Sequence, residues 1–114
     1  MDARTFAKAW CDAWNRHDLE EVLSHYADPP AHTSPLVMER LGRADGTIRD
    51  SAELRDYFRR GLEATPPLRF ELIDAFQSID GVAVLYRNHR GKTVVETMQL
   101  DAAGKVARSC VYHR

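Results

Sequence analysis

From Leu68 onward the apolar residues recur with a period of two, which is the period of side chains along a β-strand. Four such runs follow one another, at residues 68–77, 82–89, 93–100 and 106–113. Short turn signals separate them, at Asp80-Gly81, Arg90-Gly91 and Ala103-Gly104. Links this short join antiparallel neighbours, because parallel strands need crossovers of about a dozen residues or more. The sequence therefore predicts a four-stranded antiparallel meander.

The first half of the chain predicts helices that can cover one face of this sheet. Residues 3–16 carry an apolar stripe at helical spacing, made by Phe6, Ala9, Trp10, Ala13 and Trp14. Core packing is the simplest role for Trp10, whereas Trp14 lies nearer the end of the stripe, where it could line an opening.

Two further helices begin at capping boxes, in which an aspartate is followed three residues later by a glutamate. Asp18 and Glu21 start a short helix after a turn at His17-Asp18, and Asp28-Pro29-Pro30 ends it. The same spacing recurs at Asp50 and Glu53, and Thr65-Pro66-Pro67 ends the third helix.

The segment between the second and third helices predicts one more strand and a loop. Residues 31–38 indicate a strand interrupted at Pro35, which favours an edge or a bulge. Residues 39–49 are polar and glycine-containing, and so predict a loop or loose hairpin. The expected fold class is α+β, with a single domain over residues 1–114 and an antiparallel sheet of five to six strands beside three N-terminal helices.

Composition narrows the class of protein. The chain has 114 residues, of which 44% are hydrophobic, and its formal net charge is -1 without a basic run. A nucleic-acid partner is therefore not expected, and no apolar segment is long enough to span a bilayer. The two cysteines, Cys11 and Cys110, lack metal-type spacing, and a reduced cytoplasmic protein fits them better than a disulfide does. We expect no metal and no cofactor.

Both faces of the predicted sheet are apolar. In the run at 82–89, Val82, Val84 and Tyr86 share one face, and Ala83 and Leu85 share the other. Helices can cover only one of these faces. The other would be buried most simply against a second copy of the same sheet, which predicts a homodimer.

Glu96 is the one charge on an otherwise apolar face in the middle of a strand, together with Val94, Met98 and Leu100. A buried carboxylate is costly unless it is paired or its pKa is raised. One interpretation is structural, either a cross-strand ion pair with Arg87 or Arg108 or an apolar face that is half exposed. The other is a carboxylate at the floor of a pocket, acting as a general base or a ligand anchor.

Short motifs spread along nearly the whole chain resemble those of a known protein superfamily. They are Ala13-Trp14-Asn15, His17-Asp18-Leu19-Glu20, His25-Tyr26-Ala27-Asp28, Ser34-Pro35, Leu54-Arg55-Asp56-Tyr57-Phe58, Leu68-Arg69-Phe70 and Gly104-Lys105-Val106. In this respect the chain resembles the nuclear transport factor 2-like superfamily, in its SnoaL-like branch. The resemblance implies a cone-shaped, cystatin-like roll, in which a curved sheet wraps around the helices, the mouth holds a small apolar ligand and the outer face dimerises.

The resemblance also implies which residues line the cone. Glu96 and His32 are the candidate catalytic residues, although a hydrogen-bonded or solvent-facing His32 is the alternative. The candidate ligand-binding residues are Trp14, Tyr26, Phe58, Tyr86, Met98 and Tyr112. The motifs indicate the fold and not the activity.

Three functions stay open at this point. The chain could be an isomerase, cyclase or dehydratase that acts on an apolar carbonyl compound by cofactor-free acid–base chemistry. It could instead be a non-catalytic ligand-binding domain, or a dimeric scaffold whose own aromatic side chains fill the cavity. What distinguishes them is whether Glu96 faces an open cavity with His32 or a tyrosine hydroxyl within reach.

Overall fold

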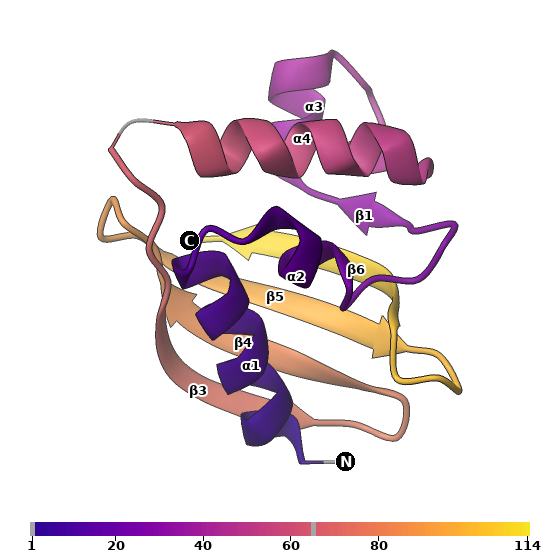
Figure 1. Ribbon diagram of the computed structural model, residues 1–114, viewed down its shortest axis with the longest axis vertical. Helices are drawn as coiled ribbons and strands as arrows, with labels where there is room; N and C mark the ends of the chain where they lie inside the picture. The colour runs from indigo at the N-terminus through magenta and orange to yellow at the C-terminus, as the bar shows by residue number, and fades with distance from the viewer. Residues whose placement is uncertain (1, 65) are drawn as a thin grey trace.

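The computed structural model describes residues 2–64 and 66–114, and within them four helices stand beside one curved six-stranded sheet (Figure 1). The helices are α1 (Ala3–Asn15), α2 (Leu19–Leu23), α3 (Pro35–Leu41) and α4 (Ser51–Glu63). The strands are β1 (His32–Thr33), β2 (Thr47–Ile48), β3 (Glu71–Gln77), β4 (Gly81–Arg87), β5 (Thr93–Leu100) and β6 (Val106–His113). The α+β class with six strands is confirmed.

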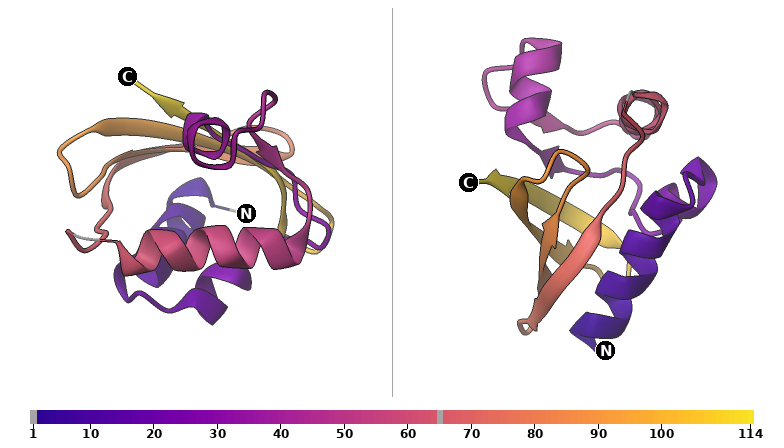
Figure 2. Two further views of the ribbon diagram at one scale, coloured as in Figure 1. Left: turned by 90° about the horizontal axis from the view of Figure 1, so that it is seen from above. Right: turned by 90° about the vertical axis from the view of Figure 1, so that its left-hand side faces the viewer.

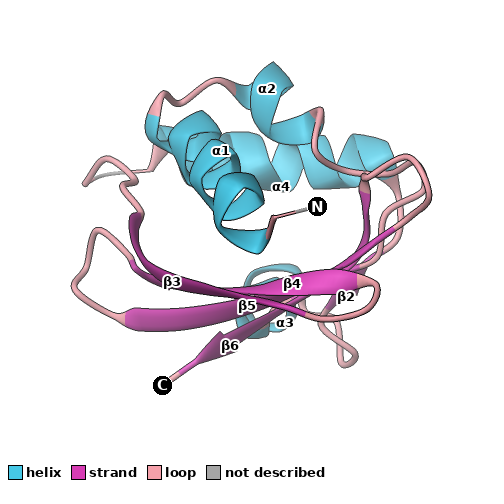
Figure 3. Cartoon of the chain, turned by 90° about the horizontal axis from the view of Figure 1, so that it is seen from below, coloured by secondary structure: helices cyan, strands magenta, loops and turns pink. Residues whose placement is uncertain are grey.

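The strand order is β2-β1-β6-β5-β4-β3. Strands β3 to β6 form the predicted antiparallel meander. The short strand β1 pairs in parallel with β6 and antiparallel with β2, so the N-terminal half of the chain completes the sheet at its β6 edge. Helices α1, α2 and α4 lie across the concave side, whereas α3 lies beside β2 and β6 (Figures 2 and 3).

The predicted helix caps are present. The side chain of Asp18 accepts a hydrogen bond from the backbone N–H of Glu21, and that of Asp50 accepts one from the N–H of Glu53. The second helix is shorter than its apolar stripe suggested, because it ends at Leu23. Tyr26 instead forms an isolated parallel bridge with Val106 of β6.

The segment from Pro35 is a correction to the sequence prediction, because residues 35–41 form a helix and not a strand. Ser34 caps this helix by accepting from the N–H of Leu36, and Pro35 occupies the first turn, where a missing donor costs nothing. The extended part is only His32–Thr33, and the predicted loop at 39–49 contains the short strand β2.

Smaller boundary differences concern the first helix and the first meander strand. Ala9, which we placed on the buried stripe of α1, is exposed, whereas Ala7 and Cys11 are buried. The first strand of the meander begins at Glu71 rather than Leu68. Thr65, the first residue of the predicted stop after the third helix, lies outside the described residues.

The core lies between the concave face of the sheet and the helices. Aromatic rings fill much of it, since Trp10 of α1 stacks on Phe70 at 5.5 Å and lies 5.6 Å from the ring of Tyr86. Each fully buried large side chain contributes roughly 1.5–3 kcal/mol. This packing holds β3 and β4 against α1 and fixes which side chains face inward.

Candidate functional site

A cavity of about 300 Å³ lies between the concave face of the sheet and the helices. Its inner wall is aromatic, with Trp10 and Trp14 from α1, Tyr57 and Phe58 from α4, and Tyr86 from β4. Such a volume is at the small end of ligand sites in proteins. The interior is therefore not fully packed by its own aromatic side chains.

Glu96 lies in this cavity, at mid-strand in β5 and opposite Val84 and Val111. Its side chain is buried, and the hydroxyl of Tyr86 donates a hydrogen bond to Oε1 at 3.2 Å. Burial raises the pKa of Glu96 to about 8, and the hydrogen bond from Tyr86 opposes that rise only in part. Near neutral pH this carboxyl is thus poised to gain or lose a proton.

The ion-pair interpretation of Glu96 does not match the placement of the two arginines. Arg87 and Arg108 are exposed on the outer face, and Arg87 pairs with Glu71 at 3.3 Å. Among the described residues, no cation lies within ion-pair distance of the Glu96 carboxylate. Its negative charge would therefore be uncompensated when it forms, which accounts for the raised pKa.

His32 lines the same cavity from β1. The ring packs edge-on against Phe58 at 5.3 Å, and Nδ1 lies 2.6 Å from Oγ of Ser109 on β6. Burial lowers the pKa of His32 to about 4, so the imidazole is neutral at pH 7. When Ser109 donates to Nδ1, the ring proton is on Nε2, and His32 is then a neutral hydrogen-bond donor.

The two tryptophans have different surroundings. Trp10 is fully buried, and its Nε1 donates to the hydroxyl of Tyr26 at 3.1 Å. Trp14 packs edge-on against Phe58 at 4.8 Å, but its buried Nε1 has no partner among the described residues. Leaving a buried N–H donor without an acceptor costs about 1–3 kcal/mol of folding free energy. A ligand in the cavity with an acceptor atom near Trp14 Nε1 would remove that cost.

Exposed residues mark where the cavity opens. They are Arg40 of α3, Arg90 and Lys92 of the β4–β5 turn, and His113 of β6. The β4–β5 turn and the C-terminal end of β6 lie at the same end of the molecule (Figures 1 and 2). We call these four residues the mouth.

Comparison with known proteins identifies the family. The profile of the SnoaL-like domain matches residues 7–109 of this chain. The chain belongs to the SnoaL-like family. None of the curated proteins compared with it matches. Residues 7–109 include both His32 and Glu96, so the two candidate catalytic residues lie within the matched range.

Solved structures agree with this SnoaL-like fold. A SnoaL-like protein of unknown function from Burkholderia thailandensis is 32% identical, with a TM-score of 0.94 and coverage of 97% of this chain and 92% of that one. AclR from Streptomyces galilaeus, a proposed hydroxylase, is 22% identical (TM-score 0.74, coverage 97% and 74%). A proposed SnoaL-like polyketide cyclase from Shewanella denitrificans is 13% identical (TM-score 0.75, coverage 97% and 89%). The last two likenesses concern the fold alone.

Of the predicted ligand-binding residues of this SnoaL-like domain, Trp14, Phe58 and Tyr86 line the cavity. Tyr26 and Met98 are buried but do not line it, and Tyr26 lies behind Trp10 as its hydrogen-bond acceptor. The placement of Tyr112 in the cone is wrong, because this side chain is 55% exposed. It alternates with Val111, which lines the cavity, and so faces outward.

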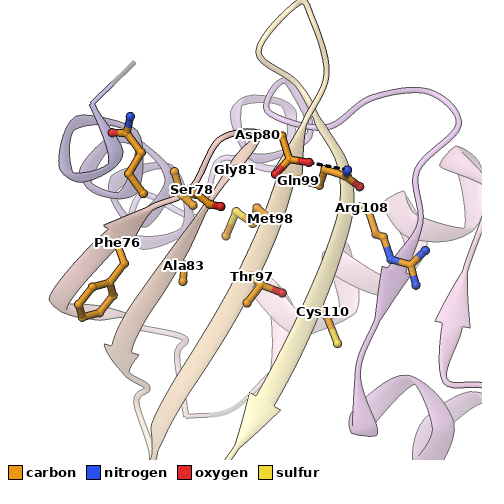
Figure 4. A pocket seen from close by; sticks show the side chains of 12 residues that line it. Phe76, Ser78, Asp80, Gly81, Ala83, Thr97, Met98, Gln99, Arg108 and Cys110 are labelled. Carbon is orange, nitrogen blue, oxygen red and sulfur yellow. Dashed lines mark hydrogen bonds between the residues drawn. The ribbon is translucent and has the colours of Figure 1, made fainter.

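The outer face of the sheet carries a second, shallower hollow (Figure 4). Phe76, Ala83, Thr97 and Cys110 line it, and its one hydrogen bond between side chains joins Gln99 to Asp80 at 2.8 Å. No buried ionisable group of this SnoaL-like domain lies in the hollow. The buried ionisable side chains Glu96 and His32 line the inner cavity instead.

Two further properties concern the described residues only. Their histidine, cysteine and carboxylate side chains form no cluster of three or more that could hold a metal ion. None of their helices has the length and apolar character required to cross a membrane.

Proposed function

We propose that this SnoaL-like domain binds a small apolar carbonyl compound in the inner cavity and acts on it by cofactor-free acid–base chemistry, as an isomerase, cyclase or dehydratase does. The observation that carries the proposal is Glu96, a carboxyl buried in the cavity wall with one tyrosine hydroxyl as its partner and a pKa of about 8. A general base works best when its pKa lies near the working pH.

The proposed step is proton transfer at the carbon next to the carbonyl. The ionised Glu96 carboxylate takes the proton, the C–H bond breaks, and its electron pair moves to give an enolate with the charge on oxygen. Neutral His32 would donate a hydrogen bond to that oxygen, as an oxyanion-hole donor does. In a ketone whose β and γ carbons share a C=C bond, the enolate is conjugated with that bond. Return of the proton from Glu96 to the γ carbon then moves the C=C bond next to the carbonyl and completes an isomerisation without an oxidant, a reductant or a metal.

Glu96 and His32 are the proposed catalytic residues, and the side chains of Trp14, Phe58 and Tyr86 are the proposed walls for the apolar body of the ligand. Tyr26 and Met98 would support these walls from behind. Tyr112 has no part in the proposed site.

The test is an NMR titration of the Glu96 side-chain carboxyl, with and without a panel of compact apolar ketones. We expect a midpoint of about 8 that moves when a ketone binds. Glu96→Gln should remove the titrating signal and abolish turnover while it leaves ketone binding largely intact. A midpoint near 4.5 that no ketone shifts would rule out the general-base role.

The second candidate function is ligand binding without turnover, and the unpartnered Nε1 of Trp14 favours it because a bound acceptor would satisfy that donor. Thermal-shift screening separates the two candidates. Binding raises the midpoint of unfolding in both cases, but only catalysis consumes the ligand.

We also infer a homodimer formed through the outer sheet face, in the cytoplasm. The face exposes Phe76 (56%) and Tyr112 (55%), and the hollow of Figure 4 lies between its strands. Exposed aromatic side chains on a sheet are typical of an interface. The free thiols Cys11 and Cys110 support the reducing compartment.

A further inference from the structure

The mouth of the cavity carries three positively charged side chains. Arg40, Arg90 and Lys92 are all exposed there, and they come from two segments that are far apart in the sequence. The whole chain has 16 basic and 17 acidic residues, so its composition does not account for a cluster of one sign.

Within residues 2–64 and 66–114, none of these three cations has a carboxylate partner. The ion pairs among the described residues involve nine other basic side chains, and Arg87, only three residues before Arg90, pairs with Glu71. The one acidic residue that lines the cavity is Glu96, which is buried. In the described part of the chain, therefore, no carboxylate pairs with the three charges at the mouth.

Other charged groups around the mouth change its net positive charge little. The C-terminal end of α4, at Gly61 and Ala64, contributes about half a negative charge from the helix dipole. Three full positive charges outweigh it. His89 and His113 also line the opening and add positive charge when protonated. The raised pKa of Glu96 keeps most of the interior neutral at pH 7.

We propose that the ligand is an amphipathic carboxylic acid, whose apolar ring system fills the aromatic interior and whose carboxylate lies at the mouth among Arg40, Arg90 and Lys92. This inference rests on the proposed function, to which it adds the class of substrate. Guanidinium groups bind carboxylates through two parallel hydrogen bonds, which fixes the orientation of the molecule. The end of the ring system far from the carboxylate would then point toward the deeply buried Glu96.

The charges also suit the approach of such a ligand. A cleft whose rim has one sign attracts ions of the opposite sign and raises their association rate. Because the rim cations are exposed, the attraction is screened within about 10 Å at 0.1 M salt. Carboxylate binding should therefore weaken as salt rises, whereas binding of a neutral analogue should not.

The test compares two probes of nearly equal shape, 2-naphthoate and the neutral ketone 2-acetylnaphthalene, by isothermal titration calorimetry. The wild type should bind naphthoate about 10-fold or more tightly than the ketone, a difference of about 1.4 kcal/mol. In the triple variant Arg40→Gln, Arg90→Gln, Lys92→Gln, that preference should disappear while ketone affinity stays the same.

The matched control is Lys8→Gln, which removes one exposed cation from α1 on the helical side of the molecule. It should keep the full preference for naphthoate. Circular dichroism checks that each variant folds, and unchanged ketone affinity checks the cavity itself.

Three results would overturn the inference, and they differ in what else they overturn. Equal affinity of the wild type for the two probes would refute only the proposal that the ligand is a carboxylic acid, and would leave the proposed function in place. Failure of both probes to bind would refute the apolar ligand cavity, and the carboxylate with it. A preference that survives in the triple variant would place the anion elsewhere.

Discussion

At the scale of the residue, Glu96 and His32 are two buried ionisable groups whose pKa values move in opposite directions. Burial raises the pKa of Glu96 from 4.5 to about 8 and lowers that of His32 from 6.5 to about 4. Both groups are therefore neutral over most of the range between about pH 4 and 8. The folded protein thus holds both side chains uncharged. Because the two pKa values differ between the folded and unfolded states, the free energy of unfolding should depend on pH.

Glu96→Gln should change that dependence above neutral pH. The folded state keeps the Glu96 proton after the unfolded chain has lost it, so this stability is complete below pH 4.5 and is lost as the pH rises through about 8. The thermal midpoint of the wild type should fall across this interval, whereas that of Glu96→Gln should fall much less. The exposed Glu39→Gln is the control and should follow the wild type. Parallel curves for all three proteins would contradict the buried carboxyl.

His32 has the reverse effect on the acid side. Because burial depresses its pKa, the stability it contributes is present above pH 6.5 and is lost as the pH falls through about 4. The same midpoint series should therefore reach its maximum between about pH 4.5 and 6.5, where the two slopes cancel. A maximum above pH 8 would be inconsistent with both assignments.

The sequence predicted buried residues of the candidate site such as Glu96, but it did not predict the exposed residues of the mouth. The alternation of β5 placed Glu96 on the inner face, because one buried face fixes the register of a whole strand. The same alternation in β6 assigns Val111 inward and Tyr112 outward, and it could have corrected the placement of Tyr112. Arg40 and Arg90 carry no such signal, since they lie outside the strands and line one cavity only in the folded protein.

At the scale of the element, the close pairing of β4 and β5 depends on Gly81. A Cβ atom at this position would lie 2.1 Å from the carbonyl oxygen of Met98, which is backbone and has little room to move. Gly81 thus allows the strands to stay in register where the meander turns.

Gly81→Ala should destabilise the protein by about 1–3 kcal/mol, because the added methyl group forces the two backbones apart. Gly61→Ala is the matched control: Gly61 lies within α4, and its added Cβ meets no atom within 4 Å. Alanine at position 61 should raise the free energy of unfolding by about 0.5–1 kcal/mol, because glycine loses more backbone entropy than alanine when it enters a helix. Urea unfolding measures both. Similar free energies for the two variants would show that the contact at Met98 is relieved without cost.

The helix α3 shows where the sequence pattern was ambiguous. Pro35 after an apparent strand indicates an edge or a bulge, but Ser34-Pro35 is equally a cap followed by proline in the first helical turn. Its seven residues are too few for periodicity to decide. The longer helices α1 and α4 and the four meander strands were predictable because their patterns extend over more residues.

At the scale of the whole molecule, the outer face of the sheet should hold two copies together. Tyr112→Glu should shift the protein toward monomer in sedimentation experiments at micromolar concentration. Two-fold symmetry repeats the new charge on both copies, and burying unpaired charges is costly. Lys8→Glu on the opposite, helical side should leave the dimer intact. A wild type that sediments only as monomer would refute the interface.

The position of β6 in the sheet has a consequence for synthesis on the ribosome. Thr33 of β1 pairs with Cys110 and His32 pairs with Ser109, so until the last strand emerges the first strand can pair only with β2 and the two cannot join the rest of the sheet. At roughly 5–20 residues per second, translation needs roughly 4–16 seconds to cover the interval from Thr33 to His113. For the first part of that time, until β3 and β4 emerge, the apolar face of α1 has no strands to pack against. Nascent chains of this protein should therefore bind chaperones that recognise exposed apolar segments.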